Sequence, residues 1–512
     1  MPLPFPKRLA PLLLALPLGG CMVGPDYAAP PTIAAGAEGG APFRRVGDLP
    51  TRPVVDAGWW RAFEDPLLDR LIEQALASSP SIAIAEARLR QSRATLRERQ
   101  ADLLPQAGAN ASYLRYRLPP LGLDKIVGGN STAGSSTGGQ APGGTAGEAA
   151  AAAEDATTGG LWSVGFDATW EIDIFGGRRR QRDQARAEAE AAEARVADAQ
   201  VSLAAEVAQA YIDLRDQQQR LILAVEATRT DEQSLSLTRQ LYERGAASLE
   251  EVARLRTQLA QSKSQETPLS AQVEQSLDRI AVLIGREPGF VDADLARAAP
   301  LPLVPARVPV DDPAAMLRRR PDVRAAERQI AAATARIGAT TAQLFPSVSL
   351  LGFIGLGAPS LGDLKLDDYT AIGTPMLRWN FLNFGRGRAQ IRQAEAGRDE
   401  TLAQYQQTVL QALQDAESAL ATFRGQRGAL GERIAGERSA TQAAALVRQR
   451  YARGAASLID LLDSQRQLNS ARQQLTQSRA DLANGYVAIA KSLGLGWRAS
   501  PPPAADRPSS GL

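Results

Sequence analysis

Cys21 is the only cysteine among the 512 residues of the chain, so no disulfide can form within it. Residues 1–20 contain a short basic segment and an apolar stretch, and two glycines stand directly before the cysteine. This order is typical of a bacterial lipoprotein signal whose lipobox is Leu18-Gly19-Gly20-Cys21. We therefore predict that Cys21 becomes an acylated N-terminus that is held on a membrane. An ordinary secretory signal with an incidental cysteine is the alternative.

Most other patterns that could do chemistry are missing. Histidine does not occur in the sequence, and its absence removes the commonest general base and the commonest transition-metal ligand. No serine lies in a nucleophile-elbow pattern. We expect no catalytic site, no metal site and no cofactor beyond covalent acyl chains on Cys21.

The charges of the chain are balanced. Lys and Arg together number 58, Asp and Glu number 56, and the formal net charge is +2. Proteins that bind nucleic acid normally carry a concentrated positive field. We therefore expect no nucleic-acid partner.

One heptapeptide occurs twice. Residues 242–248 read Tyr-Glu-Arg-Gly-Ala-Ala-Ser, and residues 451–457 read Tyr-Ala-Arg-Gly-Ala-Ala-Ser, 209 positions later. The same offset aligns Trp170 with Trp379. Matches that keep one register over so long a stretch indicate two structural repeats.

Upstream, the two copies match at an offset of 241, as in Pro80 with Pro321, so about 32 extra residues lie in the first copy. They fall in a Gly-, Ala-, Ser- and Thr-rich tract, residues 128–160, which has too few large apolar residues to order itself and is interpreted as a loop insertion. The predicted organisation is a signal peptide 1–20, an acylated extended segment 21–65, a first repeat 66–285, a connector 286–312, a second repeat 313–494 and a tail 495–512.

Four segments alternate apolar and polar residues in the manner of strands. The clearest runs from Leu161 to Phe175, where large apolar side chains recur at every second position. The others are residues 106–118, 347–357 and 369–384. Each is long enough for a tilted transmembrane strand, which needs roughly 9 to 11 residues. A small soluble sheet packed on helices is the alternative.

Four strands cannot close a barrel. Beyond residue 20 no apolar run is long enough for a membrane-spanning helix, so a spanning structure would have to be a barrel. An open sheet edge in hydrocarbon leaves backbone groups unpaired at several kcal/mol each. Three chains would supply twelve strands, an even number within the known range. We therefore predict a homotrimer that contacts lipid.

After each second strand the period changes from two to that of a helix. Residues 178–243 and 388–452 contain no proline, and an unbroken helix of roughly 65 residues would be about 100 Å long. Each stretch ends at Arg-Gly-Ala-Ala-Ser, in which glycine can end a helix and serine can cap the next one. We predict returning helices over residues 249–284 and 458–493, with Pro268 kinking or interrupting the first.

Several motifs follow one another along nearly the whole mature chain, and their order and spacing are more specific than any one of them. They are Cys21-Met22-Val23-Gly24-Pro25-Asp26-Tyr27, Trp59-Trp60, Asp65-Pro66-Leu67, Trp170-Glu171-Ile172-Asp173-Ile174-Phe175-Gly176, Arg320-Pro321-Asp322 and the two Gly-Ala-Ala-Ser-Leu turns. Together they resemble the TolC-type outer-membrane efflux duct family, specifically its lipoprotein (NodT/OprM-like) branch of resistance-nodulation-division efflux systems.

The resemblance implies an α+β membrane protein. Its fold would be a homotrimeric 12-stranded outer-membrane β-barrel, with four strands per chain, continued by a 12-helix periplasmic α-barrel of long coiled-coil helices. The segments 65–103 and 313–343 would stack end to end with the returning helices. The implied function is the passive exit duct of a tripartite efflux pump, in the outer membrane of a Gram-negative bacterium. Its partners would be a periplasmic adaptor (membrane fusion protein) and an inner-membrane resistance-nodulation-division transporter.

In this family the turns between the long helices contact the adaptor. These turns, here called the tips, map onto Gly245, Ala246, Ala247, Ser248 and Leu249 and onto Gly454, Ala455, Ala456, Ser457 and Leu458. An arginine that some relatives carry two positions after the second tip glycine is replaced by Ala456, which departs from their closed-state contacts.

The family also has a periplasmic gate. Its pore-facing acids map onto Asp460 and Asp463, and the tyrosine and acid that hold it shut map onto Tyr451 and Glu251. Three chains would gather six carboxylates around one axis, and we expect their repulsion to raise their pKa values and to attract cations. The alternative is that these acids are ordinary solvated helix residues.

Other functions remain open. A duct for type I protein secretion would have the same fold. A trimeric coiled-coil adhesin or structural stalk would share long helices and lipidation, but it would not need hairpins with a lipid-facing apolar side. A periplasmic hydrolase is disfavoured by the missing histidine.

Overall fold

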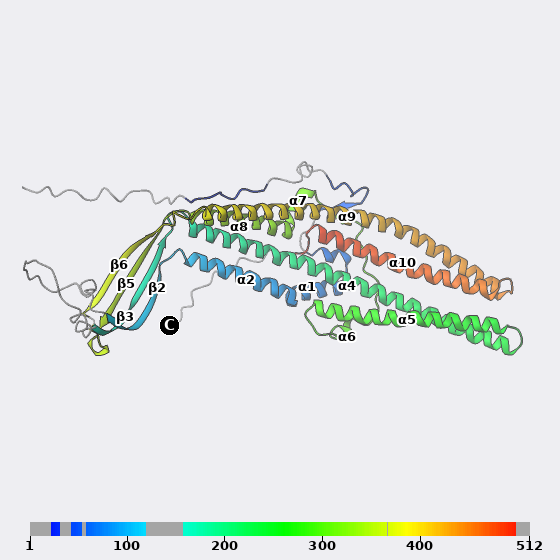
Figure 1. The fold of residues 1–512 in the computed structure, drawn as a ribbon. Helices are drawn as coiled ribbons and strands as arrows, with labels where there is room; N and C mark the ends of the chain where they lie inside the picture. Colours follow the sequence, from blue (N-terminus) through cyan, green and yellow to red (C-terminus); the bar gives the residue numbers. More distant parts are fainter. Residues whose placement is uncertain (1–21, 31–41, 54–57, 119–156, 366, 498–512) are drawn as a thin grey trace, which may run out of the picture. The chain divides into compact units, whose positions relative to one another are not determined.

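The structure, a computed structural model, describes residues 22–30, 42–53, 58–118, 157–365 and 367–497 (Figure 1). The predicted signal peptide, the acylation site Cys21, most of the predicted insertion and most of the tail lie outside these residues. The described chain divides into two compact units. The first is made of the described residues within 22–26, 97–182 and 335–394, and the second of the described residues within 27–96, 183–334 and 395–497.

The first unit contains a four-stranded antiparallel sheet in the order β2-β3-β5-β6. The elements are β2 Gln106–Leu118, β3 Thr157–Ile172, β5 Ser347–Ala358, the short 3-10 helix η2 Leu361–Asp363 and β6 Tyr369–Arg378. All four predicted strands are confirmed, but two end early. β6 stops at Arg378 instead of residue 384 because its last partner, Ser347, is the first residue of β5. β3 runs from Thr157 to Ile172 instead of from residue 161 to 175, so it begins inside the tract that was predicted as a loop insertion.

One face of the sheet is apolar and uncovered in the single chain. Phe166 pairs with Ile354, and Trp170 pairs with Leu350, so all four side chains share one side. Phe166 is 64% exposed, and the other three are also exposed. The opposite side of β3 carries polar residues such as Asp167, as the alternation predicted. Among the described residues, no strand pairs with the outer edge of β2 or of β6.

Residues 22–26 are fastened to the first unit beside the end of β3. The Val23 amide donates a hydrogen bond to the Phe175 carbonyl at 3.2 Å. The Arg180 guanidinium donates to the Val23 carbonyl at 3.2 Å and to the Asp26 carboxylate at 2.8 Å. The residues that follow the predicted acylation site therefore have a fixed position near the strand end.

Helices make up most of the second unit. The longer helices of the chain are α1 Pro66–Ser78, α2 Pro80–Ala101, α4 Gly177–Glu243, α5 Leu249–Leu283, α7 Pro313–Arg319, α8 Pro321–Ala342, α9 Arg386–Ala452 and α10 Leu458–Ser492. α4 and α9 are unbroken over 67 residues each, which confirms the two predicted long helices. In the described part of the chain, no helix combines the length and the apolar character that a membrane crossing needs.

The returning helices α5 and α10 have 35 residues each and agree with the predicted ranges to within one residue. The expected interruption at Pro268 was wrong, since α5 continues through this residue. A proline inside a helix removes one backbone donor and crowds the preceding turn. The 35-residue helix retains enough other hydrogen bonds and packed side chains, including buried Leu269, to continue past it.

The predicted end-to-end stacking is confirmed at both helix junctions, although each shorter segment is split by a proline into two helices. Where α5 ends, the Ser78 hydroxyl donates to the Ile284 carbonyl at 2.8 Å. Where α10 ends, the Arg320 guanidinium donates to the Ser492 carbonyl at 2.7 Å. The carboxyl ends of the returning helices are therefore satisfied by side chains at the α1–α2 and α7–α8 junctions.

An aromatic core holds the middle of the second unit. Trp59 and Trp60, in the 3-10 helix η1 Trp59–Phe63, are each 1% exposed and pack edge to face with ring centroids 5.8 Å apart. The Phe63 ring lies 5.2 Å from that of Tyr486 on α10. The Tyr211 hydroxyl on α4 donates to the Asp65 carboxylate at 2.7 Å. The Trp-Trp and Asp-Pro motifs are therefore part of the core.

The connector is tied to α4 by buried polar contacts. The Arg215 guanidinium donates to the Arg297 carbonyl at 3.0 Å, and the Gln218 amide donates to the Leu295 carbonyl at 2.7 Å. Leu295 ends the short helix α6 Asp292–Leu295. Beyond it, β4 Val308–Pro309 forms a two-residue parallel ladder with β1 Thr51–Arg52.

Candidate functional site

The two tips have the same backbone geometry. Gly245 and Gly454 both have a φ of 72°, the left-handed conformation that ends many helices. The next amide, of Ala246 or Ala455, donates back to the helix at 2.8 Å. A Cβ added to either glycine would meet nothing within 4 Å. Glycine is therefore required for its backbone conformation and not for space.

Each returning helix begins with a capping box. At the first tip, the Glu251 amide donates to the Ser248 hydroxyl at 3.1 Å, and the Ser248 amide donates to the Glu251 carboxylate at 2.8 Å. At the second tip, the corresponding distances between Asp460 and Ser457 are 3.1 Å and 2.9 Å. The serine caps were predicted, and the reciprocal carboxylate bonds complete the motif.

The second tip carries an arginine that sequence reasoning missed. The Arg450 guanidinium donates to the Ala455 carbonyl at 3.2 Å, across the turn. The equivalent position at the first tip is Leu241, which cannot make this bond. A basic residue in the last turn of a helix was the available signal, because such residues often satisfy its terminal carbonyls.

In the single chain, the pKa of the Asp460 carboxyl is lowered from its usual value. The main cause is the hydrogen bond from the Ser457 backbone, followed by the bond from its hydroxyl, and the Arg450 guanidinium contributes. This direction is opposite to the rise expected from a ring of carboxylates. Within the described chain, Asp460 is first of all a helix cap.

The two tips differ in burial. Leu458 is 8% exposed and packs with Leu461, Leu462 and residues of the first hairpin, whereas its counterpart Leu249 is 60% exposed. This cluster, here called the leucine cluster, joins the ends of the two hairpins. Its buried members are Leu235, Val252, Leu255, Leu458, Leu461 and Leu462.

The other predicted gate residues lie around the same cluster. Tyr451 packs against it and is partly buried, whereas its counterpart Tyr242 is 44% exposed. Asp463 forms an ion pair with Arg466, one turn further along α10. Tyr451 and Glu251 make no hydrogen bond with each other in the described chain, and the Glu251 carboxylate accepts from Ser248.

The structure brings Tyr451, Asp460 and Asp463 onto one hairpin end and places Glu251 on the other. The leucine cluster, which joins them, was not predicted as a unit. Among the residues that the structure describes, no group of three or more His, Cys, Asp or Glu side chains is placed to hold a metal ion. The arrangement offers hydrogen-bonding turns, exposed carboxylates and exposed apolar side chains, of which Leu249 at 60% is the most exposed, and these suit the recognition of another protein.

Comparison with known proteins identifies a family. The family model of outer membrane efflux proteins matches residues 71–286 and 313–495. The antibiotic efflux pump outer membrane protein ArpC of Pseudomonas putida is 30% identical over 94% of this chain and 93% of its own length. Nodulation protein T of Rhizobium leguminosarum bv. trifolii is 29% identical over 94% of this chain and 96% of its own length.

A solved structure agrees with these sequence relatives. The outer-membrane channel OprN has 34% sequence identity and a TM-score of 0.80. The match covers 93% of this chain and 100% of that one. The similarity therefore extends over the strands, the long helices and both hairpin ends.

Proposed function

The chain belongs to the outer membrane efflux protein family, and we propose that three copies of it form the passive exit duct of a tripartite efflux pump. As an outer-membrane efflux channel it has a transport role and no catalytic step. The four-stranded sheet carries this proposal. Within the described residues it has two unpaired edges and an exposed apolar face, and both would be satisfied if three sheets closed into a twelve-stranded barrel in lipid.

We further propose that residues 66–285 and 313–494 are structural repeats. One pair of equivalent hydrogen bonds supports this assignment. The Trp170 indole donates to the Leu103 carbonyl at 3.1 Å, and the Trp379 indole donates to the Leu344 carbonyl at 3.0 Å. Two helical hairpins from each of three chains would give the twelve-helix periplasmic tunnel.

The lipid anchor remains a prediction for Cys21. The contacts of residues 22–26 support a defined site for it, because Val23 and Asp26 are held by Phe175 and Arg180 beside the strand end. Acyl chains on the preceding residue would therefore enter the membrane close to the barrel rim. This location suits a protein that is both anchored to and inserted in the outer membrane.

The tips would dock a periplasmic adaptor, which connects the duct to an inner-membrane resistance-nodulation-division transporter. Exposed Leu249 is the best apolar contact for such a partner. The gate would lie at the second tip, where Asp460 and Asp463 from three chains would surround one axis. Repulsion in that ring would oppose the lowering of the Asp460 pKa by its cap.

Planar bilayer recordings of the full-length protein test this function. We expect discrete conductance steps that select cations. Neutralising both gate acids, Asp460→Asn with Asp463→Asn, should reduce the cation preference, whereas Glu73→Gln, an exposed acid on α1, should leave it unchanged. Absence of discrete steps would contradict the duct, and an unchanged cation preference would contradict the gate. Export of a polypeptide instead of small molecules in cells would favour type I secretion.

A further inference from the structure

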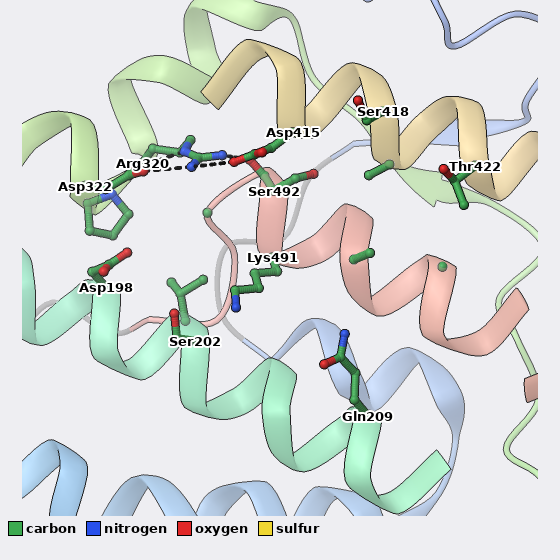
Figure 2. Close-up of a pocket in the computed structure, with 16 residues that line it drawn as sticks. Asp198, Ser202, Gln209, Arg320, Asp322, Asp415, Ser418, Thr422, Lys491 and Ser492 are labelled. Atoms are coloured by element: carbon green, nitrogen blue, oxygen red, sulfur yellow. Dashed lines mark hydrogen bonds and ion pairs between the residues drawn. The ribbon is translucent and has the colours of Figure 1, made fainter. Parts of the chain in front are cut away.

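A cavity of about 450 Å³ lies in the second unit, away from the tips. It is bounded by α4, the α7–α8 junction, α9 and α10 (Figure 2). Its size lies within the range of small-molecule sites. Apolar groups of Val201, Ala419 and Ala488 form part of its lining, and hydroxyls of Ser202 and Thr422 form another part.

One end of the cavity is a closed ionic network. The Arg320 guanidinium makes two hydrogen bonds with the Asp322 carboxylate, at 3.0 Å and 2.7 Å, and lies 3.4 Å from the Asp415 carboxylate. It also donates to the Ser492 carbonyl at 2.7 Å. Figure 2 shows these groups along the α9 side of the cavity. The one guanidinium is shared between two carboxylates, of which Asp415 is 57% exposed to solvent, and these bonds hold the Arg320 side chain in place.

Two other charged groups in the lining, half-buried Asp198 and exposed Lys491, have no direct partner among the described residues. Asp198 on α4 and Lys491 on α10 have no hydrogen bond or ion pair in the described chain, and they are not within 4.0 Å of each other. Figure 2 shows both side chains directed into the space between α4 and α10. Burial raises the pKa of the Asp198 carboxyl, and nearby Asp322 raises it further, whereas Arg320 and Lys491 lower it. A cationic ligand group beside Asp198 would stabilise the ionised form of its carboxyl.

We propose that this cavity binds a small organic zwitterion with an apolar body. Its ammonium group would lie against the Asp198 carboxylate and its carboxylate against the Lys491 ammonium, while its body contacts Val201, Ala419 and Ala488. Charge-assisted hydrogen bonds at both ends would fix its orientation. A ligand with only one of the two charges would leave the other lining charge unmatched.

The position of the cavity gives the ligand a place in transport. Ser202 and Tyr211 are nine residues apart on α4 and so project to opposite sides of it. Tyr211 faces the aromatic core, and the cavity lies on the other side. In the proposed duct this side would face the passage, so the zwitterion would be a solute in transit. This last step rests on the proposed function, but binding does not.

Three fluorescent probes with the same dansyl body test the proposal. Nε-dansyl-lysine is a zwitterion, dansylcadaverine is a cation and dansylglycine is an anion. We expect the full-length detergent-purified protein to bind the zwitterion roughly tenfold more tightly than either of the others. Equal binding of all three, or preference for a singly charged probe, would overturn the proposal. This comparison needs no altered protein.

Substitutions then locate the site. Asp198→Asn and Lys491→Met should each reduce zwitterion binding roughly tenfold, and they should abolish the preference over the anion and the cation, respectively. The matched controls Glu226→Gln on α4 and Lys263→Met on α5 change exposed charges outside the cavity and should leave binding unchanged. A preference that survives both cavity substitutions would refute this location. Bilayer conductance in the same preparations reports separately on the duct.

Discussion

The two helical hairpin ends have the same turn in different surroundings. Their glycines share one φ, and their serines form the same capping box. Yet Leu249 is exposed at the first tip, whereas Leu458 is buried in the leucine cluster at the second. Local sequence therefore determines the turn, and packing between hairpins determines what each tip can offer a partner. We therefore propose the first tip as the docking surface and the second as the gate.

Removing the leucines should give the largest difference between the tips. Leu458→Ala deletes buried contacts and should cost about 2 to 4 kcal/mol of local stability, whereas Leu249→Ala, at an exposed position, should stay within about 0.5 kcal/mol. Hydrogen exchange of peptides at the starts of α5 and α10 measures both. Equal losses of local stability at the two tips would contradict the difference in burial between Leu249 and Leu458.

A charge at the exposed leucine should separate docking from stability. Leu249→Glu should leave the hydrogen exchange of α5 unchanged and abolish both efflux and adaptor cross-linking in cells, because a charge replaces an apolar contact. Ala253→Glu, also exposed on α5, is the matched control, with a smaller effect expected because it lies a turn beyond the tip. Normal efflux by the Leu249 variant would remove this residue from the docking surface.

The tip glycines should respond alike, since only φ matters there. Gly245→Val and Gly454→Val should each cost about 1 to 2 kcal/mol, and Gly454→Val should abolish efflux while trimers still reach the membrane. Asn tolerates positive φ, so Gly454→Asn should restore part of the activity. Efflux assays with membrane fractionation measure these outcomes. A fully active Gly454→Val variant would contradict the assigned tip.

The caps should give smaller and similar effects. Ser248→Ala and Ser457→Ala should each cost about 1 kcal/mol, and Thr at either position should retain most of the cap. Faster hydrogen exchange in the first turn of α5 or α10 would report the loss. A loss at only one tip would mean that the two capping boxes are not equivalent in solution.

Acid should weaken the second cap. The pKa of the Asp460 carboxyl is lowered in the folded chain from its ordinary value of 3.8. Its contribution to the stability of the cap is therefore fully present above that value and is lost as pH falls through the lower pKa of the folded chain. Comparing the hydrogen exchange of wild type with that of Asp460→Asn at each pH isolates this contribution. The two should differ near neutral pH and converge at the lowest pH. A constant difference would mean that the carboxylate is not the source.

Much of the fold could be predicted because its signals are local. Alternation gave the four strands, the absence of proline gave α4 and α9, and the repeated glycine gave both turns. Strand ends were less predictable, because β6 ends where its partner begins, at Ser347. The interruption expected at Pro268 was wrong because the hydrogen bonds and packing of the rest of α5 outweigh the loss of the one backbone donor that proline lacks.

The candidate site was predicted only in part. Leu249 and Leu458 occupy equivalent positions in matched heptapeptides, so sequence alone treated them as equivalent. Their different burial depends on how one hairpin packs on the other. The ring of carboxylates expected at Asp460 needs three chains, whereas within one chain this residue is bonded to Ser457, three residues away. The Arg450 contact could not be predicted from the repeat, because the equivalent residue in the first copy is Leu241.

Native mass spectrometry of the full-length protein, extracted from membranes in detergent, tests the central claim most directly. An assembly of three chains is the predicted result, because three four-stranded sheets would pair the open edges of β2 and β6 in the proposed twelve-stranded barrel. A single chain that stays dissolved after the detergent is removed would contradict it.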